Sequence, residues 1–95
     1  MFTVISRWEY APANEAEVMA KADETLQKMR SWEGIEEAYN VLVGPGAVLA
    51  VVSYTDEPTY RELIKDPDGP FESLLAENQL ESLTTWIWSE SGERV

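Results

Sequence analysis

Three segments of this chain carry apolar side chains at positions that face both sides of a β-sheet. In the first segment, Phe2, Val4 and Trp8 face one side of the sheet and Ile5 faces the other. In the second segment, one side carries Ala47, Leu49 and Val51, and the other carries Val48, Ala50, Val52 and Tyr54. In the third segment, Leu83 and Ile87 face one side, and Trp86 and Trp88 face the other. A sheet with one face in water alternates apolar with polar residues. On a chain of 95 residues, a second apolar face is large enough to mark an interface. We therefore expect one face to pack on helices and the other on a second copy of the chain.

Local signals place a helix and a hairpin after the first strand, which spans residues 2–9. Helical spacing of apolar residues predicts a helix over 14–31, with Asn14 as its N-cap and Glu17 completing a capping box. Two β-rich runs, 35–43 and 47–54, flank the turn Gly44-Pro45-Gly46 and form a hairpin. Three turn residues allow more than one register. It stays open whether Tyr39 or Asn40 shares a face with Leu49 and Val51.

The second half of the chain repeats the pattern of helix and strand. Asp56-Glu57-Pro58 predicts a helix start, Asp66-Pro67-Asp68-Gly69-Pro70 interrupts that helix, and helical spacing resumes as far as Asn78. A last strand over 83–88 and a fraying tail over 89–95 follow. The order β-α-β-β-α-β is the ferredoxin-like split βαβ arrangement. We predict one α+β domain over 1–95 with a four-stranded antiparallel sheet and two helical regions on one face.

Charge and composition exclude several classes of function. The chain has 18 Asp and Glu against 7 Lys and Arg, a net charge of −11, which disfavours nucleic acid and anionic membranes as partners. It has no Cys and no His, which removes thiolate nucleophiles, zinc-thiolate sites and the commonest general base. The sequence shows no secretory signal and no membrane span, so we expect a cytoplasmic protein.

Four local patterns resemble the dimeric α+β barrel superfamily, in particular small proteins of the antibiotic biosynthesis monooxygenase type. They are the opening strand Phe2-Thr3-Val4-Ile5-Ser6-Arg7-Trp8-Glu9, the helix end Trp32-Glu33-Gly34-Ile35, the passage Val51-Val52-Ser53-Tyr54-Thr55-Asp56-Glu57 and the break Asp66-Pro67-Asp68-Gly69-Pro70-Phe71. The resemblance implies a homodimer whose two sheets close face to face, with a small cavity in each subunit. It also implies activities such as cofactor-free oxygenation of aromatic polyketides, haem degradation or isomerisation.

The haem-degrading branch of that superfamily uses an Asn, a Trp and an iron-binding His. By position, the resemblance places Ser6 where that branch has the Asn, and Ser53 or Tyr54 where it has the Trp. The His would fall near Leu75, but the chain has no His. Haem degradation by that mechanism is therefore not expected. The acidic run Asp66-Pro67-Asp68-Gly69 lacks the other ligand positions of an EF-hand and is interpreted as solvated surface. We predict neither a metal nor another cofactor.

The remaining hypothesis is a cavity that binds a small aromatic or apolar ligand. Its candidate lining residues are Ser6, Arg7, Trp8, Tyr39, Asn40, Trp86 and Trp88. Such a pocket needs aromatic walls and a few polar groups, and Arg7 or an indole N–H can stabilise an anionic oxygen. Alternatively, the Trp rings fill the dimer core, and Asn40 satisfies a backbone group. The function predicted is a monooxygenase-like activity on an aromatic quinol or polyketide, and the alternative is a non-catalytic ligand-binding or stress-related dimer. No catalytic residue is assigned.

Overall fold

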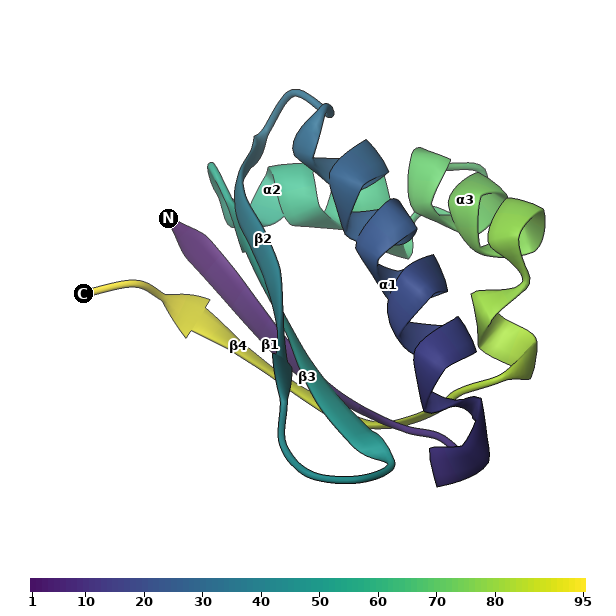
Figure 1. The fold of residues 1–95 in the computed structure, drawn as a ribbon. Helices are drawn as coiled ribbons and strands as arrows, with labels where there is room; N and C mark the ends of the chain where they lie inside the picture. Colours follow the sequence, from purple (N-terminus) through teal and green to yellow (C-terminus); the bar gives the residue numbers. More distant parts are fainter.

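A computed structural model describes all of residues 1–95 and shows one sheet with helices on one side of it (Figure 1). The strands are β1 (Phe2–Glu9), β2 (Ile35–Leu42), β3 (Ala47–Tyr54) and β4 (Thr85–Glu93). The helices are α1 (Glu15–Arg30), α2 (Glu57–Tyr60) and α3 (Pro70–Asn78), with the 3-10 turns η1 (Pro12–Asn14) and η3 (Leu80–Ser82) and the π-helical turn η2 (Arg61–Lys65).

The sheet confirms the predicted ferredoxin-like α+β arrangement. Its strand order is β2-β3-β1-β4, and every neighbouring pair is antiparallel. Both helical regions cover the same face, and the two chain ends lie near each other at one end of the sheet (Figure 1). No helix is long and apolar enough to cross a membrane.

The hairpin of β2 and β3 settles the register that its turn left open. Tyr39 is opposite Val51, and Asn40 is opposite Ala50. Tyr39 therefore shares the outer face with Val51, whereas Asn40 points to the helices. Gly46 has φ +83°, and a Cβ there would come within 2.9 Å of the Tyr10 carbonyl oxygen, so the turn admits no side chain at this position.

The predicted start of the first helix needs a correction. Asn14 makes no side-chain capping bond, so the capping box with Glu17 is wrong. Pro12 opens the turn η1, Asn14 closes it with φ −96° and ψ 5°, and α1 continues from Glu15. The start of α1 is tied to the end of β1, because the Tyr10 hydroxyl donates a 2.8 Å hydrogen bond to the Glu15 carboxylate.

The second helical region is split as predicted, and each break has a local cause. The Asp56 carboxylate accepts a hydrogen bond from the Thr59 backbone N–H at 2.8 Å and caps α2. The π-helical η2 follows, and the extended backbone of Asp66 ends it before Pro67. Pro70 then begins α3, where a missing N–H does no harm.

The last strand is longer than expected, and it contains an irregularity. Residues 89–93 do not fray, because they pair with β1 from Ser6 back to Phe2. A β-bulge shifts the register, so that Trp86 is opposite Trp8 and Trp88 is opposite Arg7. Because Arg7 and Trp8 point to opposite faces, the two tryptophans do as well, and the prediction that Trp86 and Trp88 share a face is wrong.

The two faces of the sheet have different surroundings. Towards the helices, the main core is a cluster of buried side chains: Phe2, Val4, Leu26, Met29, Ala38, Val52, Tyr54 and Leu74. The outer face has no helix over it. It presents Ile5, Tyr39, Val41 and Trp88, each 37–45% exposed, around the half-buried Leu49 and Val51. This set of six is called the outer apolar face below.

Candidate functional site

A cavity of about 610 Å³ lies between the sheet and the helices. Of its 25 lining residues, 16 are hydrophobic, which is the composition typical of a small-molecule site. The floor is the helix-facing side of all four strands, and the roof comes from α1, η2, α3 and η3. The cavity is large enough for a fused aromatic molecule.

One row of the floor differs from the rows beside it. Reading across the sheet, Asn40, Ala50, Ser6 and Ser89 are cross-strand neighbours on β2, β3, β1 and β4. The adjacent rows contain larger apolar residues, such as Val52 and Val4 on one side and Val48 and Trp8 on the other. These four residues are called the polar row below. Its small members Ala50, Ser6 and Ser89 leave space under the roof, and this space is the cavity.

At its β4 end, the polar row is held together by side-chain hydrogen bonds. The Ser6 and Ser89 hydroxyls are 2.7 Å apart, and the Trp86 indole N–H donates to Ser89 Oγ at 2.9 Å. This bond holds the Trp86 ring, which is 56% exposed, at the rim of the cavity beside Trp8. A fixed, open indole is suited to stacking on a flat ligand.

Asn40 stands at the other end of the row with its amide available. It makes no side-chain hydrogen bond within the chain, and no fully buried side-chain nitrogen or oxygen lacks a partner, so its amide is open to the cavity. Strands are about 4.8 Å apart, which puts Asn40 about 10 Å from Ser6 across Ala50. A ligand lying on the row would find hydrogen-bond donors at both ends.

The structure brings four of the seven candidate residues together and places three elsewhere. Ser6, Trp8, Asn40 and Trp86 line the cavity. Arg7, Tyr39 and Trp88 face the other side of the sheet, and the Arg7 guanidinium is paired with Glu9 at 2.9 Å.

Sequence reasoning missed Ala50 and Ser89 as parts of the site. The sequence pattern marks Ala50 only as an apolar strand residue. It predicts a fraying tail at Ser89, and only the pairing of β4 with β1 brings Ser89 to Ser6. Small residues at positions that become cross-strand neighbours are therefore the sequence feature that indicates such a cavity.

The wall towards the amino end of β1 is aromatic. The Tyr60 ring centre is 5.1 Å from that of Tyr54 and 5.5 Å from that of Phe2. Burial raises the pKa of the Tyr54 hydroxyl above its usual range, and the neighbouring Tyr60 adds to this. Tyr54 therefore stays protonated at neutral pH and is a neutral wall of the cavity.

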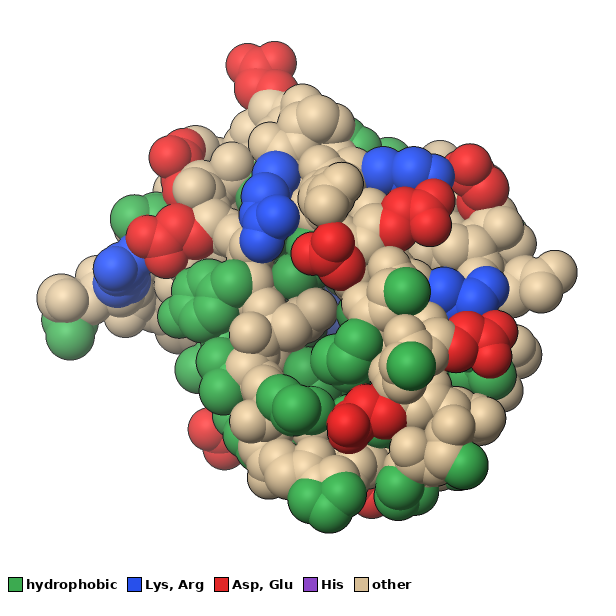
Figure 2. Space-filling model, in the orientation of Figure 1, with side chains coloured by type: hydrophobic (Ala, Val, Ile, Leu, Met, Phe, Trp, Pro, Cys, Tyr) green, Lys and Arg blue, Asp and Glu red, His purple; other side chains and the backbone are tan.

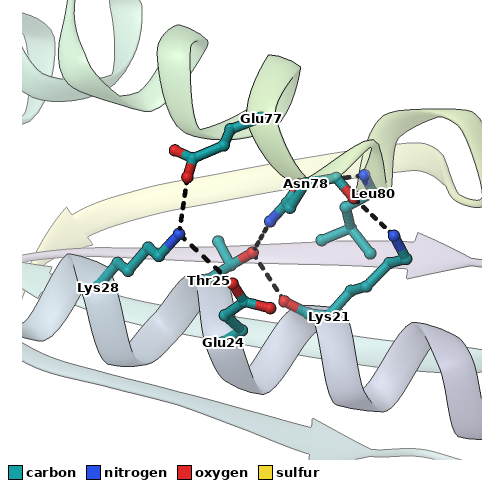
Figure 3. Close-up of polar contacts among 7 residues, drawn as sticks. All are labelled: Lys21, Glu24, Thr25, Lys28, Glu77, Asn78 and Leu80. Atoms are coloured by element: carbon teal, nitrogen blue, oxygen red, sulfur yellow. Dashed lines mark hydrogen bonds and ion pairs between the residues drawn. The ribbon is translucent and has the colours of Figure 1, made fainter.

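A buried polar contact fastens the roof (Figure 3). The Asn78 amide donates to the Thr25 hydroxyl, which donates to the Lys21 carbonyl oxygen at 2.8 Å. The side-chain oxygen of Asn78 accepts a hydrogen bond from the Leu80 backbone N–H at 3.1 Å. The backbone carbonyl oxygen of Asn78 accepts one from Lys21 Nζ at 2.8 Å. The end of α3 is thereby held on α1, with η3 following directly.

We expect Asn78→Leu to destabilise the fold, because it leaves the Leu80 N–H without a partner and removes the hydrogen bond that the buried Thr25 hydroxyl accepts. A buried group left unpaired costs about 1–3 kcal/mol, which corresponds to a fall in melting temperature of about 5–15 °C for a domain of this size. Thermal unfolding followed by circular dichroism measures it. Asn14→Leu is the control, since the Asn14 side chain caps nothing, and equal melting temperatures for the two variants would contradict the role given to Asn78.

Apart from the ammonium group of Lys65, the side-chain donors that line the cavity are hydroxyl, amide and indole groups. No three His, Cys, Asp or Glu side chains of the chain are grouped so that they could hold a metal ion. What the arrangement offers a ligand is therefore an apolar enclosure, aromatic walls and neutral hydrogen-bond donors in one row.

Comparison with known proteins assigns the fold. No protein-family model matches the chain, and no curated protein is similar to it at a significant level. Among solved structures, an antibiotic biosynthesis monooxygenase has a TM-score of 0.79 and 13% identity, over 100% of this chain and 99% of that one. A putative antibiotic biosynthesis monooxygenase from Deinococcus radiodurans has a TM-score of 0.75 and 15% identity, over 100% and 93% of the two chains. SnoaB, a cofactor-independent oxygenase from Streptomyces nogalater, has a TM-score of 0.66 and 17% identity, over 99% and 92%.

Proposed function

We propose that this chain, which has the fold of the antibiotic biosynthesis monooxygenases, oxygenates a small aromatic phenol or quinol in its cavity without a metal or flavin. The observation that carries the proposal is the polar row Asn40–Ala50–Ser6–Ser89 on the floor of an otherwise apolar cavity. Apolar walls bind the rings, and the row orients the oxygen atoms of the ligand.

The chemistry needs no separate reductant, because the substrate supplies the electrons. A phenol with a free para C–H reacts with O₂ to give a quinone and water. The O–H and C–H bonds of the phenol and the O–O bond break, a new C=O bond forms, and the second oxygen atom leaves as water with both protons. The phenol O–H gives its proton to water at the open rim, and the phenolate so formed transfers electrons to O₂.

The role of the polar row is to stabilise that phenolate. The Asn40 amide is an N–H donor open to the cavity and is assigned to the phenolate oxygen. The Ser6 hydroxyl, about 10 Å away across Ala50, faces the opposite end of the ring system. Neutral donors held by a sheet are preorganised for a developing negative charge, and the apolar surroundings strengthen their effect. Trp86 and Trp8 provide the surface for stacking at the rim.

We propose further that the working unit is a homodimer formed through the outer apolar face, located in the cytoplasm. On that face Tyr39 and Val41 of β2 are opposite Val51 and Leu49 of β3. Ile5 of β1 is opposite Val51, and Arg7 lies between Leu49 and Trp88 of β4. A contiguous apolar surface of this kind is typical of an interface between subunits. The cavity opens on the opposite side of the sheet, so dimerisation leaves it accessible.

The test is oxygen consumption with 1-naphthol as the substrate, together with detection of 1,4-naphthoquinone. Asn40→Ala should lower the turnover rate by about tenfold or more, because removal of one donor to an oxyanion has an effect of this size or larger. Asn14→Ala is the matched control, since it removes an amide that does not line the cavity and makes no capping bond. Binding of 1-naphthol without oxygen uptake would refute catalysis on this substrate class and support the non-catalytic ligand-binding dimer.

A further inference from the structure

The charged side chains that line the cavity include more acidic than basic groups. Of the 25 lining residues only Lys65, Glu72 and Glu81 carry a charge. Glu72 is on α3 and Glu81 on η3, and both are exposed, so they stand at the rim of the roof. Lys65, on η2, is exposed as well, so two carboxylates stand against one ammonium group and the charged lining residues sum to −1.

No basic side chain neutralises these two carboxylates. Neither Glu72 nor Glu81 takes part in any of the six ion pairs of the chain. Lys65 Nζ lies over the Tyr60 ring, 5.9 Å from its centre. The other basic residues are engaged elsewhere: Arg7 with Glu9, Lys28 with Glu24 and Glu77, Arg61 with Glu57, Arg94 with Glu37, and Lys21 and Arg30 with backbone carbonyl oxygens.

The wider surface has the same sign as the rim. The net charge of the chain is −11, and Figure 2 shows acidic side chains spread over the visible surface, with several Lys and Arg side chains next to an acidic one. Such a field repels anions at a distance and attracts cations.

The polar row offers a ligand that carries a permanent negative charge only neutral donors, and no cation, in place of the water that the ligand would lose. The polar groups of the row are neutral: the Asn40 amide and the bonded Ser6 and Ser89 hydroxyls, to which the Trp86 N–H is already donated. The one cationic lining residue, Lys65, is exposed and lies over the Tyr60 ring. A carboxylate or phosphate that leaves water needs a charged partner to offset its lost hydration. A neutral phenol has no such need and still gains the hydrogen bonds of the polar row.

We propose that the cavity selects its ligand by charge, accepting neutral or cationic aromatic molecules and rejecting carboxylates, sulfates and phosphates, with Glu72 and Glu81 as the residues that determine this specificity. The inference rests on the proposed function of the cavity and names its substrate class. The aromatic substrate enters uncharged, and its anion forms only on the polar row inside.

The experiment compares three ligands with the same ring system by equilibrium dialysis at low ionic strength: 1-naphthylmethanol, 1-naphthylmethylammonium and 1-naphthoate. We expect naphthoate to bind at least about tenfold more weakly than the other two. The double variant Glu72→Gln/Glu81→Gln should raise naphthoate affinity about three- to tenfold. The control Glu33→Gln/Glu36→Gln removes the same charge from an exposed segment that does not line the cavity, and it should change affinity less than about twofold.

A second measurement needs no variant. Raising the NaCl concentration from 10 to 300 mM should strengthen naphthoate binding and weaken binding of the ammonium ligand, because salt screens the charges at the rim. Equal affinities for the three ligands, or equal effects of the two double variants, would overturn the charge inference and leave the cavity as a ligand site. If none of the ligands binds, the proposed function fails and the inference fails with it.

Discussion

Ala50→Leu should weaken ligand binding at least about tenfold while the fold is kept. Ala50 is at the centre of the polar row, between Asn40 and Ser6, and its small side chain leaves the floor open. A leucine there would occupy the space in which a flat ligand lies and would separate it from the hydrogen-bond donors. Forcing extra groups into a filled site costs about 1–3 kcal/mol, so the affinity for 1-naphthol should fall at least about tenfold.

The stability of this variant should change in the opposite direction. The added side chain buries apolar surface against the roof, so the free energy of unfolding should rise by up to about 2 kcal/mol. Equilibrium dialysis and urea unfolding of the same preparation measure both effects. Ala20→Leu makes the same substitution on the exposed side of α1 and should leave affinity unchanged. Unchanged binding by Ala50→Leu would show that the ligand site is not this cavity.

Val51→Lys should convert a dimer into a monomer. Val51 is one residue from Ala50 but on the other face, where Ile5 and Tyr39 are its cross-strand partners. It therefore lies at the middle of the outer apolar face. In a dimer a lysine at this position would be buried against apolar side chains without a partner charge, whereas in a monomer it reaches water.

Sedimentation velocity at micromolar concentration measures the outcome. The native chain should sediment at twice its mass of 10.8 kDa, and Val51→Lys close to 10.8 kDa. Ala20→Lys introduces the same charge on an exposed helix position and should remain dimeric. A native chain that sediments as a monomer would refute the dimer directly. Circular dichroism should show the same secondary structure for all three proteins.

The two substitutions are informative because neighbouring residues of β3 serve the two faces of the sheet. If the cavity and the outer apolar face have separate roles, Ala50→Leu affects only binding, and Val51→Lys affects chiefly the assembly. A loss of ligand affinity in Val51→Lys as large as that in Ala50→Leu would mean that the second subunit supports the cavity floor.

Local patterns were sufficient to predict the order of the elements. Alternation predicted β1 and β3 with the bounds observed, and the prolines at 67 and 70 predicted the break in the second helical region. Where a local rule failed, a competing local geometry was the reason. At Asn14 a 3-10 turn begun by Pro12 replaced the capping box.

The candidate site was predictable only in part, because its residues meet through pairing between distant segments. Ser6, Trp8, Asn40 and Trp86 were found from their chemistry, and the structure places them around one cavity. Arg7, Tyr39 and Trp88 have equally suitable chemistry but point to the other face. Strict alternation put Trp88 beside Trp86, and one bulge in β4 reversed that relation.

Alternation and turn residues act within a few positions of each other, so the sequence alone predicts the fold class and the two apolar faces of the sheet. Which side chains share a face and a row is seen only in the folded chain. That outcome depends on the register of the hairpin and on the bulge between β1 and β4. A shift of one residue moves every side chain of a strand to the opposite face, and no pattern within a single strand specifies that shift.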